Sequence, residues 1–147
     1  MIDVTPDAYG LEARGPVSVQ RGPLRDGGAP YDTAGLVPRA QWHWLWPNLT
    51  VNIEPGPQNL SLDLWVPDGP GGLRGVTDYM FGPDATEEVA EGIIEFSQRT
   101  GAEDQALVEG VQRGLVSGMV EHGRLLLSSE HLVAHFQDMV RAALNGD

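Results

Sequence analysis

The distribution of proline and glycine divides this chain into two parts with different folding potential. All 11 prolines and most of the glycines lie at or before position 83, whereas the remaining residues are rich in helix formers. Proline and glycine mark turns and interrupt helices. The first part should therefore fold into short elements joined by turns, and the second part into helices.

Four segments of the first part have the composition or alternation of β-strands. Residues 41–55 are aromatic and β-branched, residues 59–67 alternate leucine with Ser61, Asp63 and Trp65, and residues 76–81 and 15–22 supply shorter runs. The connections between them are short. Since parallel strands need long crossovers, three or four strands connected in this way favour an antiparallel sheet.

The second part predicts helices with identifiable ends. Asp84 stands three residues before Glu87, as in a capping box, and opens the first helix. A second helix contains Asp104 and is either separate from the first or continuous with it through a kink at Gly101. A last helix has Ser128 or Ser129 as its N-cap and Gly146 as its stop.

Strands followed by helices are typical of the α+β class, with helices packed on one face of an antiparallel sheet. The 147 residues suit a single domain, residues 1–147. We expect residues 1–30 to be partly flexible, because they are rich in glycine and proline.

Charge and composition exclude several classes of function. The formal net charge is -12, which disfavours binding to nucleic acids and to anionic membranes. The chain contains no cysteine, so it offers no thiolate ligand for zinc or for an iron–sulfur cluster. Without a secretory signal or a membrane-spanning apolar run, we expect a cytoplasmic protein that contacts no membrane.

Asp104 is the first candidate for a functional residue. Val108, Val111 and Leu115 recur at helical spacing, and one turn back the same stripe reaches Asp104. Burying a carboxylate is costly unless a partner compensates for it. Asp104 is therefore either a ligand-binding group or an acid at a helix start that the helix dipole favours.

His131 and His135 are one helical turn apart, a spacing that can place two imidazoles on one metal ion. The glutamate of the zinc-hydrolase motif does not follow the first histidine. The apolar neighbours indicate a pair of half-buried structural histidines, with a zinc hydrolase as the alternative.

Trp42, Trp44 and Trp46 alternate along one predicted strand, which places all three on one face. They could line an apolar pocket for a substrate. Packing of the sheet against the helices is the more frequent use of such residues.

Several segments together resemble a known family: WLWPNLTVN, LDLWVPDGP, DYMF, EDQALVEGVQRGLVSG and HGRLLLSSEHLVAHFQDMV. They are similar to the C-terminal catalytic domain of the alpha subunits of Rieske-type non-haem iron ring-hydroxylating oxygenases. The nearest branch is that of the choline, carnitine and glycine-betaine oxygenases. The resemblance covers roughly residues 40–145 and implies a helix-grip-like domain.

The resemblance assigns a role to Asp104. Glu103 and Asp104 match an acidic pair of the family. In the family, the aspartate of this pair is the carboxylate of a 2-His-1-carboxylate Fe(II) site, which keeps coordination positions open for O2. The two iron histidines and the residues that hold the 2Fe-2S Rieske cluster have no counterpart in this chain. His131 and His135 fall in the family's last helix, away from the ligand positions.

Two hypotheses follow from the resemblance. The first is the C-terminal part of an oxygenase catalytic domain that hydroxylates or oxidatively demethylates a small organic substrate with O2. It implies a partner chain with the cluster and the iron histidines, a reductase or ferredoxin as electron donor, a homotrimer, and no turnover by the lone chain. The second is a non-catalytic remnant that binds small ligands or assembles subunits.

Overall fold

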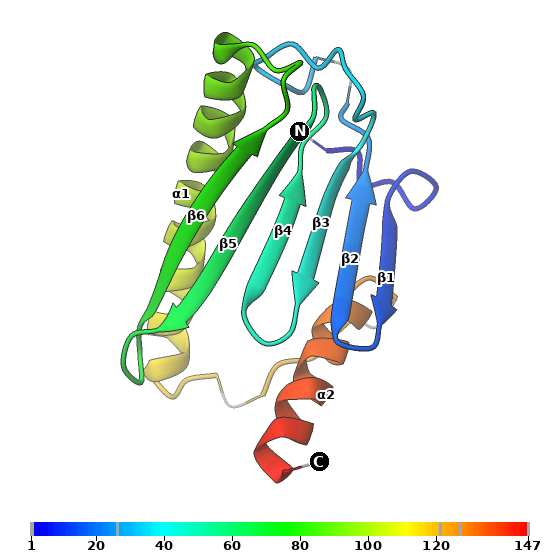
Figure 1. Cartoon of the computed structure of the whole chain (residues 1–147). Helices are drawn as coiled ribbons and strands as arrows, with labels where there is room; N and C mark the ends of the chain where they lie inside the picture. The colour runs from blue at the N-terminus through cyan, green and yellow to red at the C-terminus, as the bar shows by residue number, and fades with distance from the viewer. Residues whose placement is uncertain (1, 26, 121, 127, 147) are drawn as a thin grey trace.

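The computed structural model of the protein describes residues 2–25, 27–120, 122–126 and 128–146. Six strands precede two helices in the described chain, which confirms the α+β class (Figure 1). The strands are Gly10–Arg14 (β1), Val17–Gly22 (β2), Ala40–Leu45 (β3), Leu49–Ile53 (β4), Asn59–Pro67 (β5) and Leu73–Phe81 (β6). The helices are Glu87–Val116 (α1) and His131–Asn145 (α2).

The six strands form one antiparallel sheet in the order β1-β2-β3-β4-β5-β6. Each strand pairs with the next one along the chain, as expected for strands joined by short turns. The sheet has more strands than the three or four that the sequence predicts. Residues 41–55 supply both β3 and β4, because the chain turns at residues 46–48.

Residues 10–22 lie inside the segment that we expected to be flexible, and they form β1 and β2. Gly15 adopts a left-handed conformation (φ 53°) in the turn between these strands, which glycine permits at little steric cost. The hairpin pairs with β3 and thereby extends the sheet at one edge.

Helix α1 begins differently from the prediction. Its N-cap is Thr86, whose Oγ1 accepts a hydrogen bond from the Val89 backbone N–H at 3.3 Å. Asp84 instead accepts a hydrogen bond from the Gln58 backbone N–H. The helix then runs for 30 residues without a break at Gly101, so the two predicted helices are one.

Helix α2 has Glu130 at its N-cap, so the prediction of Ser128 or Ser129 is wrong. The backbone N–H groups of Ser129 and Glu130 both donate to the Leu126 carbonyl, which places Ser129 in a turn before the helix. At the other end, Gly146 is left-handed (φ 79°) and its N–H donates to the Ala142 carbonyl. This confirms Gly146 as the stop.

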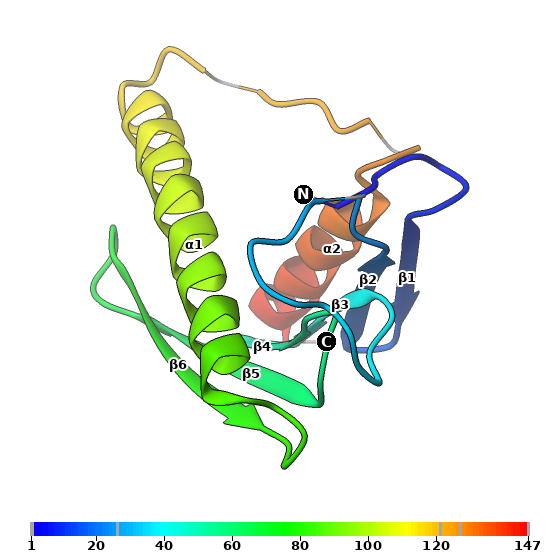
Figure 2. The same ribbon diagram turned by 90° about the horizontal axis from the view of Figure 1, so that it is seen from above.

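Both helices lie on the same face of the sheet, here called the inner face (Figure 2). Tyr79 of β6 and Ser97 of α1 share a hydrogen bond at 3.1 Å. On α2, the Phe136 ring lies 4.9 Å from the ring of Trp44. None of the helices in the described chain is long and apolar enough to span a bilayer.

The opposite face of the sheet, here called the outer face, is mainly apolar at β5 and β6, where Arg74 and Asp78 are its charged residues. Strand register puts Leu60, Leu62, Leu64 and Val66 of β5 there, beside Val76 and Met80 of β6. Leu64 is 42% exposed and Val76 is 52% exposed. The inner face of the same strands carries Ser61, Asp63, Trp65, Thr77 and Tyr79. The polar side of this part of the sheet thus faces helix α1.

Candidate functional site

A groove of about 1460 Å³ lies between helix α1 and the inner face of the sheet. The sheet contributes Trp42, Asn52, Glu54, Asp63 and Trp65 to its walls, and α1 contributes Asp104, Gln105, Val108 and Gln112. Aromatic, acidic and amide side chains therefore converge on one space. Its volume exceeds that of most small-molecule pockets.

Asp104 lies on the side of α1 that borders this groove. Val108 and Gln112 follow at intervals of one turn and line the groove too, which fits a helix of 3.6 residues per turn. Val111 and Leu115 are not among the lining residues and are 62% and 52% exposed. Asp104 and Val108 border the groove as the predicted stripe requires, but Val108 is 67% exposed and Asp104 is exposed too, so the expected burial of this carboxylate is not observed. Gln112 lies on the same side of the helix.

Asp63 is the centre of a hydrogen-bond network on the floor of the groove. Its Oδ2 accepts from Asn52 Nδ2 at 2.6 Å and from Thr50 Oγ1 at 2.9 Å, and its Oδ1 accepts from Thr77 Oγ1 at 2.7 Å. The donors come from β4 and β6, on either side of Asp63 in β5. These bonds hold the carboxylate in a defined position.

Glu54 directly follows β4 and borders the same groove. Burial raises the pKa of its carboxyl group, and a hydrogen bond from Trp42 partly offsets that effect. Its Oε2 atom is buried and has no hydrogen-bond partner among the described residues. Neither Glu54 nor Asp63 is among the functional residues predicted from the sequence.

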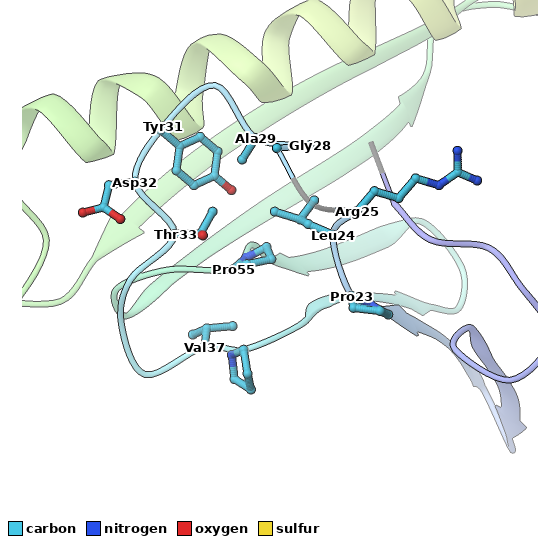
Figure 3. A pocket seen from close by; sticks show the side chains of 12 residues that line it. Pro23, Leu24, Arg25, Gly28, Ala29, Tyr31, Asp32, Thr33, Val37 and Pro55 are labelled. Atoms are coloured by element: carbon cyan, nitrogen blue, oxygen red, sulfur yellow. The ribbon is translucent and has the colours of Figure 1, made fainter.

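A second, smaller cavity of about 400 Å³ lies beneath the loop that connects β2 to β3. Tyr31 points into it, and the other lining side chains come from the same loop and from Pro55 (Figure 3). Burial, followed by the nearby charge of Glu54, raises the pKa of Tyr31. Its hydroxyl is buried without a partner in the described chain.

The three tryptophans share the inner face but have different surroundings. Trp44 and Trp46 pack against Phe136 of α2, at centroid distances of 4.9 and 6.2 Å. Trp42 lines the groove. A pocket-lining role thus stays a prediction for Trp42. Trp44 and Trp46 lie in the contact between the sheet and α2. Trp65 lines the groove as well.

The described residues do not by themselves fit a metal site. Across residues 2–25, 27–120, 122–126 and 128–146, no three His, Asp or Glu side chains lie close enough together to hold a metal ion. Asp104 thus offers one carboxylate to a potential iron site. His131 and His135 are neighbours at the start of α2, and within the described chain they lack the third ligand that a zinc hydrolase needs.

Comparison with known proteins adds independent observations. The family model for the ring hydroxylating alpha subunit (catalytic domain) matches residues 20–146. No curated protein sequence matches the chain.

Among solved structures, the quaternary ammonium Rieske monooxygenase CntA in complex with the inhibitor MMV12 is 26% identical and superposes with a TM-score of 0.73. That match covers 93% of this chain and 38% of the other. A structure of a quaternary ammonium Rieske monooxygenase, described for carnitine oxidation by gut microbiota and inter-subunit electron transfer, is 25% identical with a TM-score of 0.68. This second match covers 91% of the present chain and 38% of the other protein's chain. The chain thus spans well under half of either protein.

Proposed function

This chain belongs to the ring-hydroxylating alpha subunit family, to its catalytic domain, and we propose that it forms the C-terminal part of the catalytic domain of a Rieske non-haem iron oxygenase. The reaction would be O2-dependent hydroxylation or oxidative demethylation of a small organic substrate. The observation that carries this proposal is the position of Asp104, which borders one groove together with the aromatic and polar residues of the inner face.

In this proposal Asp104 supplies the carboxylate of a 2-His-1-carboxylate Fe(II) site. The two histidines and the 2Fe-2S Rieske cluster would come from another polypeptide or from another part of a longer protein. A reductase or ferredoxin would deliver electrons, and the assembly would be a homotrimer in a cytoplasmic setting. Because one carboxylate cannot hold iron in an open facial site, the lone chain should not turn over.

The proposed substrate class is the quaternary ammonium compounds, as in the two similar structures. Trp42 and Trp65 line the groove, and aromatic faces attract organic cations. Trp44 and Trp46 would support this wall from the contact with α2.

Iron content of a reconstituted complex tests the proposal. The DNA upstream of the Met1 codon is sequenced to search for paired histidines and cluster ligands, and the polypeptide that carries them is assembled with this chain. We expect iron retention to be lost with Asp104→Ala and kept with Glu95→Gln. Glu95 is an exposed acid nine residues earlier on α1, which is on the opposite side of the helix. Full iron occupancy with Asp104→Ala would reject the assignment.

A second candidate function is a non-catalytic module that binds small ligands or assembles subunits. The observation in its favour is that no group of three potential metal ligands exists among the described residues. The exposed apolar outer face is a surface of the kind that partners cover. This candidate predicts ligand or partner binding that is unaffected by removal of iron with a chelator.

A further inference from the structure

The main chain at Glu54 is fixed in place by one neighbouring side chain. Asn59 Oδ1 accepts a hydrogen bond from the Glu54 backbone N–H at 2.8 Å, and Asn59 Nδ2 donates to the Glu54 carbonyl at 2.7 Å. Asn59 Nδ2 also donates to the Pro57 carbonyl at 2.8 Å. Asn59, at the end of the turn from β4 to β5, thus bonds to the backbone at the start of the same turn. These bonds fix the backbone from which the Glu54 side chain projects.

Glu54 lines the groove, and one oxygen of its carboxylate is buried. Trp42 donates a hydrogen bond to the carboxylate, whereas Oε2 is buried and has no partner in the described chain. A buried acceptor without a partner costs free energy, and a buried charge costs more. A positive charge beside the carboxylate would offset part of this cost.

The groove that Glu54 lines has an excess of negative charge along its walls. Its walls include five carboxylates, Glu54, Asp63, Glu103, Asp104 and Glu109, and two guanidinium groups, Arg99 and Arg113. Both arginines have contacts on α1: Arg99 lies 5.7 Å from the Phe96 ring centroid, and Arg113 lies 3.9 Å from Glu109. Such a groove attracts small cations and repels anions.

We propose that Glu54 is the anionic residue that recognises the cationic group of the substrate, with Trp42 as the aromatic wall beside that group. This inference rests on the proposed function and names a specificity-determining residue within it. The charge of Glu54 attracts an organic ammonium ion, and the indole of Trp42 stabilises its methyl groups by cation–π contact. Glu54 selects the ligand and takes no part in the chemical step.

An organic cation suits this position better than a metal ion. A single carboxylate beside one indole lacks the several oxygen or nitrogen ligands that metals require. A quaternary ammonium ion has no N–H donor, so it needs only nearby negative charge and an apolar contact surface. Both are present around Glu54.

Paired ligands that differ in charge test the inference. Choline and its neutral isostere 3,3-dimethylbutan-1-ol have nearly the same shape, and their binding to the 147-residue chain can be measured by isothermal titration calorimetry. We expect the wild-type chain to prefer choline by at least about tenfold, because a desolvated charge pair is lost with the neutral ligand. Glu54→Gln should abolish that preference and leave binding of the alcohol unchanged.

The control is Asp78→Asn, which removes an exposed carboxylate from the outer face of the same sheet. This variant should retain the preference for choline. A measurement that needs no variant is the pH dependence in the wild type: the preference should decline as acid protonates Glu54.

Absence of a choline preference in the wild type, or its persistence in Glu54→Gln, would overturn the inference. Either result leaves the iron assignment of Asp104 intact, because that assignment is tested by iron content. Conversely, loss of the preference in Glu54→Gln together with full iron occupancy in the Asp104→Ala complex would support Glu54 and reject the oxygenase site.

Discussion

Asn52 Nδ2 lies 2.6 Å from Asp63 Oδ2 across the β4–β5 pair, and the amide donates to the carboxylate on the inner face of the sheet. Two threonine hydroxyls, from Thr50 and Thr77, donate to the same carboxylate at 2.9 and 2.7 Å. One side chain therefore links three adjacent strands beneath helix α1. The floor of the groove is rigid because these bonds share a single acceptor group.

Replacing Asp63 with alanine should destabilise the protein, because Asn52, Thr50 and Thr77 would lose their common acceptor. We expect the free energy of unfolding to fall by about 0.5–1.5 kcal/mol, because the donors are part-buried or exposed and water can replace part of the lost hydrogen bonding. Urea denaturation monitored by circular dichroism measures it. Asp63→Asn keeps one acceptor oxygen and should lose less. Equal stability of the alanine variant and the wild type would show that the network contributes nothing.

Two glycines of helix α1 should respond in opposite ways to alanine. A Cβ atom at Gly92 would lie 2.8 Å from the Tyr31 Cβ, so Gly92→Ala should push the β2–β3 loop away and cost roughly 1–3 kcal/mol. At Gly114 a Cβ would meet no atom of the described chain within 4 Å. Gly114→Ala should therefore stabilise the helix by about 0.5–1 kcal/mol. Thermal unfolding of both variants checks the signs, and a stabilised Gly92→Ala would contradict the close packing.

Sequence patterns were sufficient for the class of the fold and for the type of its elements. The division of proline and glycine predicts strands before helices, and short connections predict the antiparallel order. Element ends were predicted less well. The predicted N-caps, Asp84 for the first helix and Ser128 or Ser129 for the last, were wrong. The N-caps in the structure are the nearby residues Thr86 and Glu130. Competition between adjacent capping residues depends on the turn before the helix, which local composition does not specify.

The candidate site was predictable only in part. Helical spacing from Val108 and the family resemblance both indicated Asp104, and the structure places Asp104 at the groove. Asp63 had a signal in the alternation of residues 59–67, which puts it opposite the leucines. Which face the helices cover could not be read from that alternation, because the apolar face is the exposed one. Glu54 had no local signal, since its burial comes from residues distant in sequence.

The outer face should promote self-association of the isolated chain. Leu64 and Val76 are directly paired across β5 and β6 and are 42% and 52% exposed. Contiguous exposed apolar surface favours association. The double variant Leu64→Lys/Val76→Glu places opposite charges across the strands, so it should reduce association without loss of the sheet. Sedimentation velocity measures the change. The control Leu107→Lys alters an exposed apolar residue of α1, and an equal effect there would argue against the outer face as the cause.

The stability of the wild type relative to Glu54→Gln should depend on pH. Burial raises the pKa of Glu54 above its ordinary 4.5, so the folded state holds this proton more tightly than the unfolded state. The resulting stabilisation is fully present below pH 4.5 and is lost as the pH rises through the folded-state pKa. Glutamine does not titrate, so the free energy of unfolding of the wild type minus that of the variant should decrease over this range and then level off. Urea denaturation at a series of pH values measures the difference. Choline should stabilise the wild type more than Glu54→Gln at neutral pH, since it binds more tightly to the folded form in which Glu54 is ionised. A difference that increases with pH would mean that Glu54 is stabilised as an anion without a ligand.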